Sequence, residues 1–160
     1  MQNTAKLVYT LIVVFITAFL CSYLNKYGME NFYYALMFPP LVPPSFVFPI
    51  AWTLIYSLMI VSFFIVSVKS TPEEFKNCNF WFLGQLLLHV LWTYSFFYAG
   101  AIGIGAIILL LLCYNVYKMI KEFYGVDKFA AYLQYPYALW VLFATYMNIG
   151  FVYYNGTFIL

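Results

Sequence analysis

The chain has 160 residues, of which 66% are hydrophobic and only 8% are charged, and its formal net charge is +2. Soluble domains average about 25% charged residues, so this sequence cannot cover a globular protein of its length with a water-facing surface. The small net charge and the lack of a basic stripe argue against a nucleic-acid partner, and we expect the lipid bilayer to be the solvent.

Five runs of the chain are apolar over about 20 residues, the length that a helix needs to cross the hydrocarbon core. Lipid offers no hydrogen bonds to the backbone, and continuous apolarity without period-two alternation excludes barrel strands. We therefore predict an all-α integral membrane protein, a single five-transmembrane-helix bundle over residues 1–160. The expected helices span approximately 6–24, 46–68, 80–98, 101–120 and 129–154.

The basic residues predict the orientation of this bundle. All seven are lysines. Only Lys26 lies in the connection between the first and second helices, whereas the others lie at the N-terminus and in the second and fourth connections. The positive-inside rule places the N-terminus inside and, after an odd number of helices, the C-terminus outside. The segment "CSYLNKYGMEN" after the first run contains no A-x-A-type cleavage site, so we expect a retained helix rather than a signal peptide.

The connection over residues 25–45 is the longest and is rich in aromatic residues and proline. Its pairs Pro39-Pro40 and Pro43-Pro44 favour an extended or polyproline backbone, and a proline at 43 or 44 fits the first turn of the next helix. Two interpretations stay open here: a capped helix start, or a stiff lid over the mouth of the bundle. In the second connection, "VKSTPEEFKNCN", we expect Ser70 or Thr71 to cap a short turn that begins at Pro72.

Few residues offer catalytic or metal chemistry. The cysteines Cys21, Cys78 and Cys113 are scattered and include no C-x-x-C pair, which indicates neither a disulfide framework nor a zinc site. No charged residue lies near the middle of a predicted span, which argues against a proton-coupled pump. His89 is the only histidine, so it could supply one axial haem ligand, with a hydrogen-bonded bundle histidine as the default interpretation. We expect no catalytic residue and no metal.

Polar and aromatic side chains recur at helical spacing on three of the predicted helices. These faces comprise Trp52, Tyr56 and Phe63 in the second helix, Gln85, His89, Trp92 and Phe96 in the third, and Tyr137, Trp140, Ala144, Asn148, Phe151 and Asn155 in the fifth. Polar side chains in lipid turn inward, so the faces should meet inside the bundle. Interhelical hydrogen bonds and an aromatic cavity for a flat ligand explain them equally well.

Three blocks carry a resemblance to a known family. They are "FYYALMFPPLVPPSFVFPIAWTLIYSLM", "QLLLHVLWTYSFF" and "YPYALWVLFATYMNIGFVYYN". In this order they resemble the TspO/MBR family, also called tryptophan-rich sensory proteins, translocator proteins or peripheral benzodiazepine receptor-like proteins. The first block is similar to the family pattern W-Y-x-x-L-x-K-P followed by W-T-x-x-Y-x-L-M, with Phe32 in place of the first tryptophan and Phe38 in place of the lysine. His89 stands where the family usually has Asn.

The resemblance implies a ligand and a site. Family ligands are porphyrins such as protoporphyrin IX and haem, and in some members sterols or isoquinoline and benzodiazepine drugs. Together with the aromatic faces, it leads us to expect a ligand site made of Trp52, Tyr56, Gln85, His89, Trp92, Phe96, Tyr137, Trp140, Ala144, Met147 and Asn148. It also favours the lid interpretation of residues 25–45, with Phe38, Pro39, Pro40, Pro43 and Pro44 over the mouth.

We therefore expect a membrane receptor or carrier for tetrapyrroles, with no required cofactor, rather than an enzyme. The alternatives are light- or oxygen-dependent porphyrin breakdown through Trp52 and Trp140, and a bundle that only scaffolds partners. The expected partners are the bilayer, a hydrophobic small molecule and, by resemblance, a second copy of the chain. The lysine asymmetry suits a bacterial cell membrane with a cytoplasmic N-terminus, and the mitochondrial outer membrane is the alternative.

Overall fold

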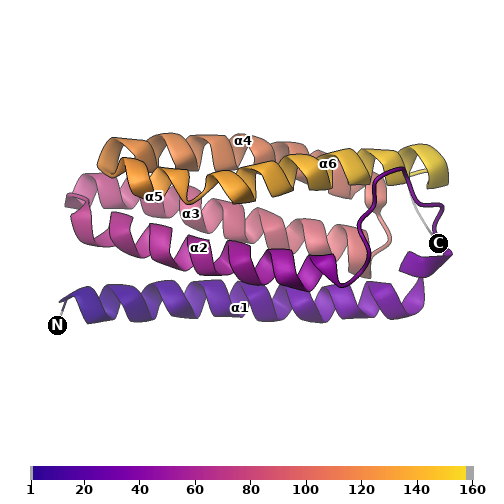
Figure 1. Ribbon diagram of the computed structural model, residues 1–160, viewed down its shortest axis with the longest axis horizontal. Helices are drawn as coiled ribbons and strands as arrows, with labels where there is room; N and C mark the ends of the chain where they lie inside the picture. The colour runs from indigo at the N-terminus through magenta and orange to yellow at the C-terminus, as the bar shows by residue number, and fades with distance from the viewer. Residues whose placement is uncertain (1, 158–160) are drawn as a thin grey trace.

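The computed structural model describes residues 2–157 and consists there of helices and their connections. The five long helices are α1 (Gln2–Asn31), α2 (Val47–Lys69), α3 (Pro72–Thr93), α4 (Ile102–Val126) and α6 (Tyr135–Asn155). Three short elements join them: the 3-10 turn η1 (Tyr33–Ala35), the π-helix η2 (Tyr94–Tyr98), which continues α3, and α5 (Lys128–Tyr132). In Figure 1 the long helices run side by side, with α1 along one side, α2 and α3 in the middle, and α4 and α6 along the other side.

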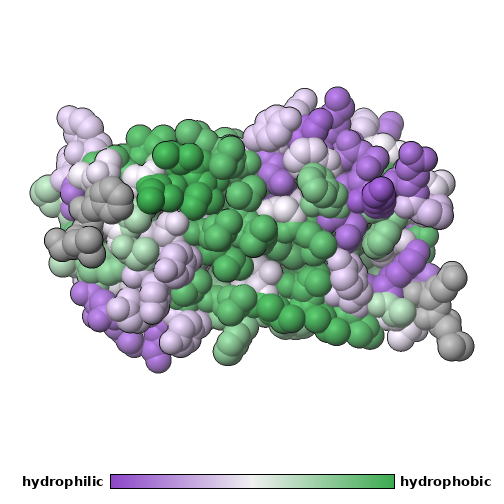
Figure 2. Space-filling view, turned by 180° about the vertical axis from the view of Figure 1, so that it is seen from behind, coloured by the Kyte–Doolittle hydropathy of each residue, from purple (hydrophilic) through white to green (hydrophobic). Residues whose placement is uncertain are grey.

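Four of these helices, α1 to α4, are long and apolar enough to cross a membrane. Helix α6 has 21 residues, which is also long enough to cross, although it is not one of these four. Figure 2 shows hydrophobic residues gathered across the middle of the molecule and hydrophilic residues toward both ends. The prediction of an all-helical membrane protein is confirmed, and the crossing of all five helices stays a prediction.

Lysines mark one end of the bundle. The Lys6 ammonium donates to the Ser67 carbonyl, and Lys69 bonds the Asp127 carboxylate, so the start of α1, the end of α2 and the α4–α5 junction lie together. The hydrogen bond from Lys69 holds the pKa of Asp127 below its usual range, which keeps the carboxylate ionised. Lys26 lies toward the opposite end, near the end of α1. That the lysine end faces the cytoplasm stays a prediction.

Helix α3 begins at Pro72, earlier than the expected residue 80, because Thr71 and Glu74 form a capping box. The Glu74 N–H donates to Thr71 Oγ1 over 3.4 Å, and the Thr71 N–H donates to the Glu74 carboxylate over 2.8 Å. The polar turns after Pro72 are therefore helical. Helices α1 and α4 also run past their expected ends, because hydropathy reports the lipid-facing length of a helix and not its hydrogen-bonded length.

The two halves of the bundle differ in packing. Toward the lysine end, the Phe63 and Phe82 rings stack with centroids 3.9 Å apart, Phe123 lies against both, and all three side chains are fully buried. The Ser62 hydroxyl donates to the Ala130 carbonyl over 2.7 Å and ties α2 to α5. The interior of this half is closely packed around these rings, and an aromatic cavity lies toward the other end.

Toward the other end, α1 packs directly on the π-helix η2. A Cβ atom at Gly28 would lie 2.4 Å from the carbonyl oxygen of Phe97 and 2.8 Å from its Cα. The Tyr27 and Tyr98 rings meet beside this contact, with centroids 4.6 Å apart. The absence of a side chain at position 28 thus sets the distance between α1 and the end of α3.

We predict that Gly28→Ala destabilises the protein, because its methyl group meets backbone atoms that cannot move aside. Overpacking of this kind costs roughly 1 to 3 kcal/mol. Thermal unfolding in detergent should show a clearly lower midpoint. Gly125→Ala is the matched control, since nothing lies within 4 Å of a Cβ atom at that helical position. Equal midpoints for the two variants would contradict the close contact of α1 with η2.

Candidate functional site

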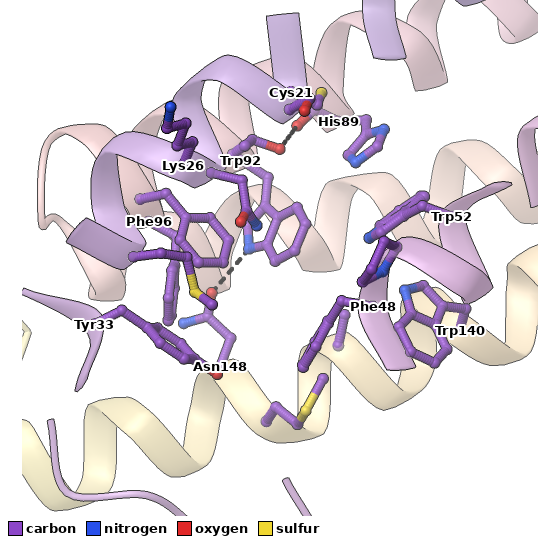
Figure 3. Close-up of a pocket in the computed structure, with 18 of the residues that line it drawn as sticks. Cys21, Lys26, Tyr33, Phe48, Trp52, His89, Trp92, Phe96, Trp140 and Asn148 are labelled. Carbon is purple, nitrogen blue, oxygen red and sulfur yellow. Dashed lines mark hydrogen bonds between the residues drawn. The ribbon is translucent and has the colours of Figure 1, made fainter. Parts of the chain in front are cut away.

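A cavity of about 380 Å³ lies in the half of the bundle away from the lysine end. Helices α1, α2, α3 and α6 supply its walls, together with η2, and Tyr33 of η1 reaches its edge. Its volume lies within the range of small-molecule sites, roughly 300 to 1,000 Å³. Figure 3 shows aromatic side chains from several helices arranged around the space.

Three rings form a stack on one wall. Trp52 of α2 lies face to face with His89 of α3, with centroids 4.3 Å apart and planes 18° from parallel. Trp92, one turn further along α3, continues the stack at 5.9 Å and 22° from His89. The Tyr56 hydroxyl lies 3.4 Å from His89 Nδ1. Offset stacking of this kind is favourable between ring systems and leaves flat surfaces for a further ring.

The wall between α2 and α6 is closed by aromatic edges. Trp140 of α6 meets Trp52 at 6.3 Å and Phe48 at 5.9 Å between centroids, both edge to face. The indoles of Trp52 and Trp140 therefore lie side by side in the lining, as Figure 3 shows. Ala144, one turn beyond Trp140, also lines the cavity, and its methyl group leaves room between these larger rings.

Asn148 lines the cavity, but the oxygen and nitrogen of its side-chain amide are both hydrogen-bonded to other protein groups. The Trp92 indole N–H donates to Asn148 Oδ1 over 3.0 Å, and the Asn148 amide N–H donates to the Ile102 carbonyl over 2.7 Å. A Cβ atom at Gly105 would lie 3.0 Å from Asn148 Oδ1, so this glycine allows α4 to approach the pair. Asn148 consequently fixes the orientation of the Trp92 ring and ties α6 to α3 and α4.

Nine of the eleven residues expected at the ligand site do line the cavity. They are Trp52, Tyr56, His89, Trp92, Phe96, Trp140, Ala144, Met147 and Asn148. Gln85 and Tyr137 do not. Both are buried one turn nearer the lysine end, where the Tyr137 hydroxyl donates to Gln85 Oε1 over 2.8 Å. They share the correct helix faces, but at their depth the bundle is filled, and they form an interhelical hydrogen bond.

We predict that Tyr137→Phe lowers stability without changing ligand affinity. Losing the hydroxyl leaves the buried Gln85 carbonyl oxygen without its donor, which costs about 1 to 3 kcal/mol. The second substitution Gln85→Leu should recover part of this loss in a double-mutant cycle, because no polar atom is then stranded. The control is Tyr153→Phe on the same helix, whose ring is 82% exposed. A changed ligand affinity of Tyr137→Phe with an unchanged unfolding midpoint would show that Tyr137 does belong to the binding site.

The proline connection lies on α6 rather than in the cavity. Asn155 binds the Met37 backbone twice: its Oδ1 accepts from the Met37 N–H and its Nδ2 donates to the Met37 carbonyl, over 2.8 and 2.9 Å. The Tyr146 hydroxyl donates to the Pro40 carbonyl over 3.0 Å, and Pro39 packs against Gly150. In Figure 1 this connection crosses from the end of α1 to α6 over one end of the bundle.

None of the expected lid residues lines the cavity: Phe38, Pro39, Pro40, Pro43 and Pro44 lie outside its wall. Phe38 packs edge to face on Tyr33 and Phe151, and these two rings do line the cavity. The connection contacts the cavity directly at Tyr33 and Ser45, which line it. It also supports the wall indirectly, because Phe38 packs on lining rings.

Helix α1 supplies lining residues that the sequence analysis did not predict: Ala18, Cys21, Ser22, Asn25, Lys26 and Met29. Phe48, Thr93 and Phe97 were also missed. A signal was present in α1, because Ala18, Ser22 and Asn25 are spaced by four and three residues and form a small or polar stripe on an otherwise apolar helix. Within residues 2–157, no group of three or more His, Cys, Asp or Glu side chains is placed to hold a metal ion.

These features define an α-helical membrane bundle with an aromatic cavity between its helices. The chain belongs to the TspO/MBR family, whose model matches residues 9–154. The family predicted from the three sequence blocks is thereby confirmed.

Three relatives illustrate the breadth of this similarity. Protein CrtK of Rhodobacter capsulatus is 31% identical over 145 residues, which cover 88% of this chain and 90% of the relative. The tryptophan-rich protein TspO of Archaeoglobus fulgidus is 29% identical over 97% of this chain and its own full length. The human translocator protein is 30% identical over 74% of this chain and 71% of its own.

Proposed function

We propose that this protein is a membrane receptor or carrier that binds a porphyrin-type tetrapyrrole in the cavity between α1, α2, α3 and α6. The observation that carries the proposal is the stack of Trp52, His89 and Trp92 on one cavity wall, with Trp140 beside it. A flat, apolar and polarisable ligand is the kind that such a wall binds, because it can continue the stack.

Interhelical hydrogen bonding alone does not account for this region. It explains Gln85 with Tyr137, and Asn148 with Trp92. It gives no reason for a 380 Å³ space beside large aromatic rings, since protein interiors are otherwise closely packed.

We predict that Ala144→Leu weakens protoporphyrin IX binding about tenfold or more, because the larger side chain fills the space between the rings. Ala144 is only 3% exposed, so some loss of stability is expected as well, and affinity and unfolding midpoint must be measured on the same sample. Tryptophan quenching during a protoporphyrin IX titration measures the affinity.

Ala138→Leu is the matched control, because Ala138 lies on the same helix but outside the cavity wall. Its affinity should equal that of the parent protein. A large fall in midpoint with unchanged affinity in Ala144→Leu would mean that the ligand binds elsewhere.

A second candidate function is breakdown of the bound porphyrin in light and oxygen. The edge-to-face pair of Trp52 and Trp140 favours it, because it places two oxidisable indoles in the cavity wall. Illumination of the protein with protoporphyrin IX in air separates the two functions. If the porphyrin Soret band bleaches with the parent protein but not with Trp52→Phe or Trp140→Phe, the result supports breakdown. Tryptophan quenching without bleaching supports a receptor or carrier.

A further inference from the structure

The cavity is open on one side, between α1 and α2. Its exposed lining residues are Ser22 and Lys26 on α1, and Ser45 and Pro49 at the start of α2. The lining residues from α3 and α6 are much less accessible: His89 is 2% exposed and Asn148 is 1% exposed. Helices α3 and α6 therefore form the floor of the cavity, and the last turns of α1 form one edge of its mouth.

The mouth and the floor differ in chemistry. On α1, Ser22, Asn25 and Lys26 are spaced by three and four residues, so they share one face of the helix. Lys26 is the only charged residue among those that line the cavity. In Figure 3 its side chain lies at the edge of the cluster, apart from the rings of Trp52 and Trp140. A cation and polar groups thus border an opening whose interior is aromatic.

Lys26 is available to a ligand. Its ammonium lies 3.8 Å from the Glu30 carboxylate one turn later, but the two side chains are 75% and 63% exposed. Exposed pairs of this kind are weak, so a ligand carboxylate can replace Glu30 as the partner. Lys26 also lies about one and a half turns before the end of α1, a depth from which a lysine side chain reaches the membrane surface.

We propose that Lys26, with Ser22 and Asn25, is the subsite for a carboxylate of the ligand. This inference rests on the proposed function and narrows it to tetrapyrroles that carry acidic side chains. The ring system enters between α1 and α2 and stacks on Trp52, while the carboxylates stay in the mouth. This orientation follows from desolvation, because the aromatic floor offers a carboxylate no partner cation, whereas the mouth offers water and Lys26.

The test compares protoporphyrin IX with its dimethyl ester, which has the same ring system but no carboxylates. Binding is measured by tryptophan quenching in nanodiscs of zwitterionic lipid, for the parent protein, Lys26→Gln and Glu30→Gln. Lys26→Gln should weaken binding of the acid about tenfold and leave the ester unchanged. Glu30→Gln should tighten binding of the acid, because a competing carboxylate is removed.

Lys76→Gln is the matched control, since Lys76 is exposed at the opposite end of the bundle, and it should change neither affinity. Unfolding midpoints verify that every variant is folded. Equal losses for acid and ester in Lys26→Gln would overturn the subsite and make Lys26 a residue that only shapes the cavity. Unchanged binding of both would also overturn the subsite but leave the proposed function standing. If the parent protein binds neither compound, the proposed function itself fails.

Discussion

Lipid cannot hydrogen-bond a polar side chain, and most of this structure depends on that constraint. Each amide or hydroxyl within the helices has to find its partner inside the bundle or on its own backbone. Gln85 pairs with Tyr137, Asn148 joins Trp92 to the Ile102 carbonyl, and the Thr10 and Thr17 hydroxyls donate to carbonyls one turn earlier in α1. Among the described residues, the exceptions are the Gln134 side-chain amide at the break between α5 and α6, the Asn115 side-chain oxygen in α4, and the Ser70 hydroxyl, which are buried without a protein partner.

The bundle has two halves that differ in how closely their aromatic rings pack. Toward the lysine end, aromatic rings stack closely and the core is filled, as the contact of Phe63 with Phe82 shows. Toward the other end, α2 and α6 meet through the edges of Trp52, Phe48 and Trp140, and a cavity lies behind these rings. The second half thus contains the cavity in which we propose that the ligand binds.

The connection between α1 and α2 stabilises the hollow half from outside. Its prolines favour an extended path, which carries the chain across the end of the bundle to α6. Asn155 and Tyr146 hold it there through backbone groups at Met37 and Pro40, and Phe38 supports the cavity-lining rings of Tyr33 and Phe151. This segment therefore supports the aromatic wall through Phe38, and it also reaches the mouth of the cavity at Ser45.

The class of protein, the helical bundle, the family and most of the cavity residues could be predicted from the amino-acid sequence. Apolar runs of membrane length permit only helices, and three ordered motifs identify the TspO/MBR family. Helical periodicity also placed Trp52, His89, Trp92 and Trp140 on inward faces, because spacing along a chain reports direction around the helix axis.

Which side chains each inward face contacts depends on the packing of the helices, and the sequence pattern does not report it. Periodicity does not report depth along a bundle, so Gln85 and Tyr137 could not be separated from the cavity residues one turn away. Periodicity also does not show which neighbour a polar group bonds, so the hydrogen bond between Trp92 and Asn148 could not be predicted. Nor could it show that Lys26 of α1 borders the cavity, since that follows from how α1 packs on η2 at Gly28.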